Sequence, residues 1–269
     1  MPIQFITLFC AFYGTIMYSR KRNHGGPSRK AKVSLARTLS KAGYCSRSKA
    51  FGLIREGRVR LNGIVIRDPE TRLDMDLDRV EVDSRSLAPA RKIYIMLNKP
   101  RGIVATAADE KGRETVYSCL AGGNFPWLAP VGRLDKASEG LLLLTNDTRW
   151  AAAILDPRTH IPKTYHVQID RVVDEGVLRQ IREGTTLLDG SFLAVKSAGI
   201  LRRGKRNCWL EIVLEEGKNR HIRRLLDTSG IEVLRIVRVA VGALKLGNLE
   251  KGAYRHLSPE EIESLRISP

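Results

Sequence analysis

Apolar positions follow a helical period in the first part of this chain. Leu35, Leu39 and Ala42 recur at helical spacing, and Gly43 is placed to end that helix. Ser46 can cap a second helix, because a serine at this position accepts a hydrogen bond from a free backbone N–H of the first turn. The apolar positions of that second helix are Ala50, Leu53 and Ile54. The pattern therefore predicts two consecutive short helices.

The period changes from helical to strand-like after Gly57. The run from Val59 to Ile66 reads as two short strands around Asn62-Gly63, whose residues tolerate the positive φ of a tight hairpin turn. Two helices followed by strands form a compact unit from Val33 to about Asp83. A stretch rich in small residues, 84–90, is the predicted linker to the rest of the chain.

Strand-like runs dominate the region after the linker, with helix-like segments between them. The runs are Ile93–Leu97, Leu141–Thr145, Thr164–Ile169, Cys208–Leu214 and Val233–Val239. Ser258-Pro-Glu-Glu261 combines an N-cap, a proline at the first helical position and a capping-box acid, which predicts a short terminal helix. This mixture predicts an α+β fold with a mixed, mostly antiparallel sheet in residues 91–269.

The segment 1–32 is predicted to be a flexible extension with an apolar start and a basic arm. Its apolar run is typical of the middle of a signal peptide or of a short membrane anchor. The cations Arg20, Lys21 and Arg22 follow that run, none precedes it, and the run is slightly short for a spanning helix. These features favour a cytoplasmic protein without membrane association. Translation from Met17 is a further hypothesis, which leaves open whether residues 1–16 are native.

Charge is concentrated at the beginning of the chain. The formal net charge is +17, and between Arg20 and Arg60 thirteen Lys or Arg face a single acid, Glu56. Such a concentration favours a polyanionic partner, with nucleic acid ahead of anionic membrane, although a solvated basic surface is the simpler alternative. The four cysteines lack the close spacing of a zinc or redox site, and the five histidines are scattered. No metal site is expected.

The candidate for chemistry is a loop between two apolar runs, Pro130-Val-Gly-Arg-Leu-Asp-Lys136. Asp135 has Arg133 and Lys136 close in sequence, and neighbouring cations favour the carboxylate form that a nucleophile or base requires. On spacing alone, a capping or salt-bridged aspartate is the commoner explanation.

Two resemblances extend this interpretation. Residues 35–50 and the stretch Gly57-Arg-Val-Arg-Leu-Asn-Gly63 resemble the alpha-L RNA-binding module, which also occurs in a ribosomal protein and in bacterial tyrosyl-tRNA synthetases. The resemblance implies RNA-backbone contacts for Arg47, Lys49 and Arg58, because positive charge binds phosphate without reading sequence. For each side chain, a solvated surface charge is an equally good interpretation.

The larger region is similar to the bacterial ribosomal RNA pseudouridine synthases that carry this module. The matching motifs, in order, are Leu97-Asn-Lys-Pro-Arg-Gly102, Val131-Gly-Arg-Leu-Asp135 with 140–147, Lys163-Thr-Tyr165 and Glu216-Gly-Lys-Asn-Arg-His-Ile-Arg-Arg224. The resemblance implies that Asp135 is the essential catalytic residue. It also implies that Arg133 helps to hold the target nucleotide out of its stack.

Further roles follow from the same resemblance. Tyr165 is expected to support the displaced base, and Arg223 to pair with Asp135 and orient it. Leu144 and Ile222 are expected to wall the uracil pocket, although core packing would explain both. Arg220 and Arg224 are interpreted as phosphate contacts or plain surface charge. The implied enzyme is a monomer that uses no cofactor, with ribosomal RNA or a pre-ribosomal particle as its partner.

Two other functions remain as alternatives. A non-catalytic RNA-binding ribosome-assembly factor would share the module and the charge, but the joint presence of Asp135, Tyr165 and Arg223 argues against it. A glycosidic-bond hydrolase would be expected to have two acids in distinct environments, and Glu139 has no clear partner role. The sequence leaves open which ribosomal subunit and uridine are modified. It also leaves open whether Asp135 attacks the sugar or takes a proton from it.

Overall fold

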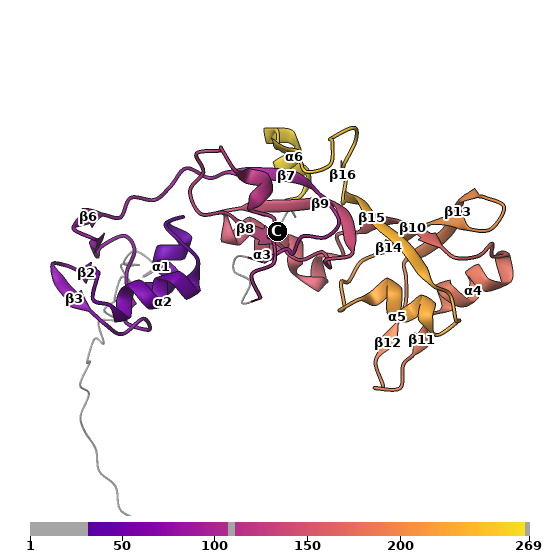
Figure 1. Cartoon of the computed structure of the whole chain (residues 1–269). Coiled ribbons are helices and arrows are strands. Elements are labelled where there is room, and N and C mark those ends of the chain that lie inside the picture. Colours follow the sequence, from indigo (N-terminus) through magenta and orange to yellow (C-terminus); the bar gives the residue numbers. More distant parts are fainter. Residues whose placement is uncertain (1–31, 107–110, 267–269) are drawn as a thin grey trace, which may run out of the picture. The chain divides into compact units, whose positions relative to one another are not determined.

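The computed structural model describes residues 32–106 and 111–266 (Figure 1). The predictions about the apolar start, the basic arm and Met17 concern residues outside these ranges. Within the described ranges, no helix combines the length and apolar character that crossing a membrane requires.

The first group of elements contains two helices and two small sheets. Strand β1 pairs with β4, and the other strands form a sheet in the order β3-β2-β5-β6. Apolar side chains from both helices and from these strands make one buried cluster. The elements are β1 (Val33–Ser34), α1 (Leu35–Lys41), α2 (Arg47–Arg55), β2 (Val59–Leu61), β3 (Ile64–Ile66), β4 (Arg72–Leu73), β5 (Val80–Val82) and β6 (Arg85–Ser86).

The local signals in this part act as the sequence predicts. Gly43, just beyond α1, has a φ of +76°. The Ser46 side chain caps α2 by accepting from the Lys49 backbone N–H at 3.1 Å. Asn62 and Gly63 both have positive φ in the turn between β2 and β3. Both helices and this hairpin are therefore confirmed.

The predicted linker 84–90 differs in one respect from the structure. Residues Arg85 and Ser86 form β6, which pairs with β5. The chain reverses through Asp83 and Ser84, which both have positive φ. This hairpin was missed because neither residue of the pair is glycine, the usual sign of such a turn. The proposed boundaries between the parts of the chain stay predictions.

The second group of elements is built on one nine-stranded sheet. Its order is β13-β14-β10-β15-β9-β7-β17, with β16 paired to β15 and β8 to β9. Strand β15 runs parallel to β9, and the other pairs of this sheet are antiparallel, as predicted. The strands are β7 (Tyr94–Lys99), β8 (Ala129–Val131), β9 (Ser138–Thr145), β10 (Lys163–Ile169), β13 (Ser197–Arg203), β14 (Cys208–Leu214), β15 (Val233–Val241), β16 (Leu244–Lys245) and β17 (Tyr254–His256).

Helices and short connecting elements complete this part of the fold (Figure 1). One buried cluster joins β10, β14 and β15 to α4 and α5, and strand β9 is buried along its whole length at the centre of the sheet. The remaining elements are η1 (Ser118–Leu120), α3 (Thr148–Leu155), η2 (Pro157–Thr159), α4 (Glu175–Glu183), β11 (Thr185–Thr186), β12 (Phe192–Leu193), α5 (His221–Asp227) and α6 (Pro259–Ser264).

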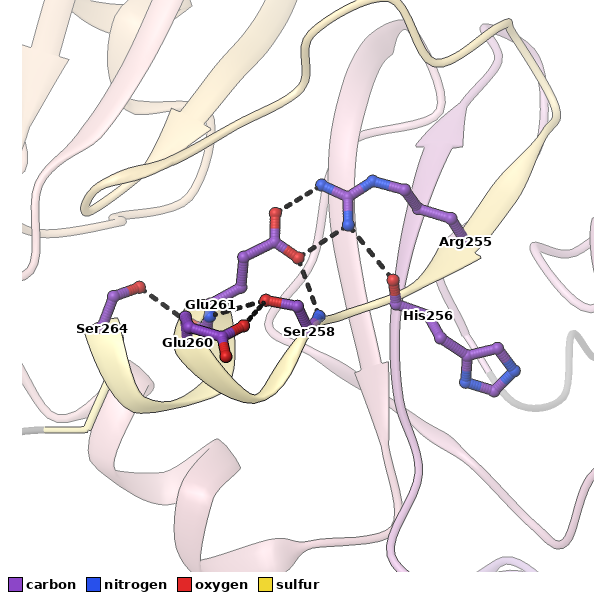
Figure 2. A network of polar contacts seen from close by, with 6 residues as sticks. All are labelled: Arg255, His256, Ser258, Glu260, Glu261 and Ser264. Carbon is purple, nitrogen blue, oxygen red and sulfur yellow. Dashed lines mark hydrogen bonds and ion pairs between the residues drawn. The ribbon is translucent and has the colours of Figure 1, made fainter.

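The last helix, α6, begins with the predicted capping box (Figure 2). The Ser258 hydroxyl accepts from the Glu261 backbone N–H at 3.3 Å, and the Glu261 carboxylate accepts from the Ser258 backbone N–H at 2.9 Å. Arg255 donates to both carboxylate oxygens of Glu261. These contacts satisfy free N–H groups of the first turn, so that a helix of six residues can begin at a fixed place.

Candidate active site

A cavity of about 570 Å³ opens beside the loop between β8 and β9. Its volume falls in the range of pockets that bind small molecules, roughly 300–1,000 Å³. The loop contributes Asp135, which is half-buried, and the other walls come from β10, the start of α5 and β15. The lining includes Arg133, Tyr165, Arg220, Ile222 and Arg223. Segments that are more than one hundred residues apart in the sequence, such as those of Asp135 and Arg238, therefore meet around one cavity.

A buried lysine holds the backbone of the Asp135 loop in place. Lys99, at the end of β7, is fully buried, and its Nζ donates to the carbonyl oxygens of Asp135 at 3.2 Å, Ser138 at 2.8 Å and Pro100 at 3.1 Å. The Gly102 backbone N–H adds a bond to the Lys136 carbonyl at 2.8 Å. The motif Leu97–Gly102 thus braces the loop that carries Asp135. Sequence reasoning identified the motif but missed this role.

The charge of Lys99 also belongs to the electrostatics of the site. Burial lowers the pKa of its ammonium group to about 8, while the nearby Asp135 and Glu139 oppose this change. Three carbonyl oxygens are a sound arrangement for three ammonium N–H donors, so the group is buried with its hydrogen bonds made. The ammonium group of Lys99 thus places a positive charge beside the loop that carries Asp135.

Three other predicted residues meet at this cavity. Tyr165 lies on β10, is half-buried, and packs against two apolar clusters. Ile222 is buried in the first turn of α5, and Arg133 is exposed two residues before Asp135. An aromatic ring, an apolar side chain and a cation therefore surround the space next to the carboxylate.

Arg223 lies in the cavity wall without pairing directly with Asp135. Its Nη1 donates to the Val233 carbonyl at 2.9 Å, and its buried Nε has no hydrogen-bond partner among the described residues. Burial lowers the pKa of the guanidinium, Arg220 lowers it further, and Asp135 opposes the change. The expected ion pair is thus absent from the described contacts, because the guanidinium is anchored to the strand behind it. Arg223 and Asp135 interact through space instead.

Leu144 does not wall the cavity, contrary to the prediction. Its side chain is fully buried in the apolar cluster that contains Ile95 and Leu97, and it does not line the cavity. Leu143 lines the cavity instead. Successive side chains of a strand point to opposite faces, so a shift of one residue along β9 changes the face.

The predicted RNA-binding cations fall into two groups, one on and just after α2 and the other at α5. Arg47 and Lys49 are exposed on α2, and their side chains make no ion pair among the described residues. Arg58, by contrast, donates from Nε and Nη2 to the Asp83 carboxylate at 2.8 and 2.6 Å. In the second group, Arg220 lines the cavity, whereas Arg224 lies outside its lining and pairs with Asp189. Arg58 and Arg224 are therefore less available to phosphate.

The remaining candidates for other chemistry lie elsewhere. Glu139 is buried away from the cavity lining, where Arg235 donates to both of its carboxylate oxygens and Lys251 lies 2.7 Å away. Cys45, Cys119 and Cys208 are free thiols, and Cys10 is outside the described residues. In the part of the chain that the structure describes, no group of three or more His, Cys, Asp or Glu is placed to hold a metal ion.

Comparison with known proteins identifies relatives of both parts of the chain. The family model for RNA pseudouridylate synthase matches residues 93–228, and the model for the S4 domain matches residues 33–78. An RNA pseudouridine synthase of Aquifex aeolicus, described as uncharacterized, is 39% identical over 236 residues, which cover 87% of this chain and 94% of the relative.

Two further similarities extend over most of the chain. The ribosomal large subunit pseudouridine synthase B of Bacillus subtilis is 34% identical over 234 residues, covering 86% of this chain and 95% of the relative. A crystal structure of a pseudouridylate synthase superposes with a TM-score of 0.60 at 30% identity, covering 87% of this chain and all of that chain. Sequence and fold therefore lead to the same group of proteins.

Proposed function

Because this chain belongs to the RNA pseudouridylate synthase family and isomerises uridine in RNA, we propose that it modifies one site in ribosomal RNA with Asp135 as the catalytic residue. The observation that supports this role is the position of Asp135. Its loop is held by Lys99 at the edge of a cavity that also contains Tyr165 and Arg223.

The reaction changes the uracil atom that is bonded to the anomeric carbon of the ribose, from N1 to carbon 5. The bond between N1 and the anomeric carbon breaks, the base rotates, and carbon 5 bonds to the anomeric carbon. The proton on carbon 5 leaves and N1 gains a proton, so nothing is consumed or released. The Asp135 carboxylate can attack the anomeric carbon as the bond to N1 breaks, and it then leaves when carbon 5 bonds there. Alternatively, it can take the proton from the 2′ carbon of the sugar as N1 leaves and return that proton when carbon 5 bonds. Both routes use the carboxylate of Asp135, and the cations Lys99 and Arg223 lie near it.

The uracil must leave its stack before either route can begin. Unstacked bases in RNA-binding proteins commonly lie against aromatic side chains, and Tyr165 offers such a face on β10. Arg133 is exposed at the mouth of the same cavity and can hold the nucleotide in its displaced position. Ile222 and Leu143 supply apolar contact for the rotating ring.

The S4 domain supplies RNA affinity that does not depend on the chemistry. Arg47 and Lys49 are exposed on α2, where they can contact phosphates. The Bacillus subtilis relative is a ribosomal large subunit pseudouridine synthase, which supports ribosomal RNA as the substrate. We expect the enzyme to act as a monomer in the cytoplasm.

Mapping pseudouridine in RNA from cells that lack the gene tests this proposal. We expect one pseudouridine of ribosomal RNA to disappear, and the wild-type gene to restore it. Transfer RNA from the same cells serves as the internal control and should keep its pattern. An unchanged ribosomal RNA map would contradict the assignment of the substrate, and a loss confined to transfer RNA would identify a different one.

A further inference from the structure

Arg238 is a buried cation in the cavity wall that the sequence motifs do not include. It lies on β15 with 6% of its surface exposed, and it lines the same cavity as Asp135. Its Cα is paired with that of Tyr165 on β10 and with that of Gly140 on β9. Cross-strand partners share a face of a sheet, so Arg238 and Tyr165 lie side by side on the cavity face.

The strand next to Arg238 is shaped to let the two backbones approach closely. Gly140 has a φ of +101°, and a Cβ at this position would lie 2.3 Å from the Arg238 carbonyl oxygen. The Arg238 Nε donates to the Leu141 carbonyl at 2.7 Å. This bond fixes the guanidinium from one side. Neither Nη of Arg238 is both buried and without a hydrogen-bond partner. Since Arg238 lines the cavity, we infer that its two Nη groups face that space.

Nothing in the described part of the chain neutralises the charge of Arg238, since none of its carboxylates lies within ion-pair distance of this guanidinium. Arginines buried to this degree are normally paired with an acid, because an isolated buried charge is unfavourable. Lys163 on β10 also lines the cavity, and its Nζ donates to the Glu215 carbonyl at 3.2 Å. Burial and the nearby Arg238 lower the pKa of Lys163. Two cations thus share one part of the cavity wall.

We propose that Arg238, assisted by Lys163, binds the phosphate group next to the target uridine when that nucleotide enters the cavity. The proposal rests on the proposed function, because RNA supplies a phosphate on each side of every nucleoside. A guanidinium offers a planar fork of N–H donors that matches two phosphate oxygens. With Nε occupied by Leu141, both Nη groups remain for this contact. Binding the phosphate beside Tyr165 would fix the ribose relative to Asp135 while the base rotates.

The two flanking phosphates can be distinguished by removing their charge one at a time. The probe is the RNA that the wild-type enzyme converts, synthesised with an uncharged methylphosphonate on the 5′ side or the 3′ side of the target. The 2′-hydroxyl beside each altered linkage is methylated in the test RNA and in its phosphate control. Dissociation constants are measured for wild type and for Arg238→Gln with each RNA.

We expect Arg238→Gln and one of the two methylphosphonates each to weaken binding roughly 10- to 100-fold. Arg238→Gln should bind that methylphosphonate RNA no more weakly than the more damaging of the two single changes allows, because both changes remove the same contact. The proposal would be overturned if the losses of affinity caused by Arg238→Gln and by the methylphosphonate multiplied at both linkages. Wild-type affinity of Arg238→Gln for the unaltered RNA would also overturn it. Arg203→Gln, an exposed cation on β13, is the matched control and should change affinity less than about threefold.

A second variant, Arg238→Lys, tests the same contact. If Arg238→Gln unfolds, Arg238→Lys keeps the charge and loses the fork, so it should bind about three- to tenfold more weakly with its coupling to the same linkage retained. Equal binding by Arg238→Lys, with no coupling, would contradict the proposal. The probe is whichever RNA the wild-type enzyme converts. An error in assigning ribosomal RNA would therefore change the probe, but the comparison of the single and combined changes would still test Arg238.

Discussion

The S4 domain and the cavity both present positive charge, but they present it in opposite ways. On α2 the cations Arg47 and Lys49 are exposed and free of ion pairs among the described residues. Around the cavity, Lys99, Arg223 and Arg238 are largely buried and fixed by backbone carbonyl oxygens. Exposed cations contribute affinity that salt screens, whereas buried cations hold groups in one geometry. We therefore propose that the cations of the S4 domain capture RNA, whereas those around the cavity hold it for the chemistry.

Apart from replacing Asp135 itself, removing the buried lysine should have the largest effect on the conversion rate. Lys99→Met leaves the carbonyl oxygens of Asp135, Ser138 and Pro100 without their donor, so the loop can shift. A displacement of about 1 Å in an active site can reduce a rate by roughly 10²-fold, and we expect a loss of that size. Single-turnover conversion at saturating RNA measures it, and affinity should stay within about threefold of wild type. A rate close to that of wild type would show that the loop does not need Lys99.

Changing the exposed cations should have the opposite profile. Arg47→Glu combined with Lys49→Glu should weaken RNA binding about tenfold. The slope of the binding constant against salt concentration, both on logarithmic scales, should fall by the equivalent of about two phosphate contacts. The rate at saturating RNA should not change. Arg58→Gln is the matched control, because Arg58 is already bound to Asp83, and its effect on affinity should be smaller. A titration of binding against salt concentration distinguishes these outcomes, and equal effects would remove the contrast.

The ionisation of Lys99 provides a third test of the buried environment. We expect its ammonium group to titrate with a pKa of about 8, lowered by burial, whereas exposed lysines titrate near 10.5. In the window between these values the unfolded chain binds more protons than the folded one. This group therefore makes the folded state more stable as the pH rises from about 8 to 10. NMR of labelled lysine side chains measures the midpoint, and Lys99→Arg identifies the signal. A midpoint near 10.5 would contradict the buried placement.

The smallest effect belongs to a contact remote from both functions. Ser258→Ala removes the side chain that caps α6, and similar changes cost about 1 kcal/mol of unfolding free energy. Conversion rate and RNA affinity should both stay at wild-type values. Denaturant unfolding measures the change in stability, with Ser264→Ala, near the end of the same helix, as the control (Figure 2). A fall in the rate would connect α6 to the active site.

Sequence reasoning predicted the elements better than the contacts of the site. Helix signals such as Ser46, Ser258 and Gly43 act within a few residues, so their effects can be read locally. The long strands carry strong apolar runs, and β14 was predicted at its observed bounds. Edge strand β13 was missed, because its residues alternate poorly between buried and exposed.

The site shows where local patterns stop being informative. Strand β9 is buried on both faces, so its four leucines give no alternation, and Leu144 could not be distinguished from Leu143. The role of Lys99 depends on carbonyl oxygens 36 and 39 residues away. Arg238 looks like an exposed strand cation until β9 and β10 are placed beside it. These roles come from the pairing of strands, which no single segment specifies.

The most direct test of the catalytic role of Asp135 replaces its carboxylate with the amide of the same shape. Single-turnover conversion and the dissociation constant are measured together for wild type and Asp135→Asn, with the RNA that the wild type converts. We expect the rate to fall by about 10⁴-fold or more while the dissociation constant stays within about threefold. Conversion within tenfold of wild type would contradict the assignment of chemistry to Asp135. A comparable loss of RNA binding would contradict the separation of capture from catalysis.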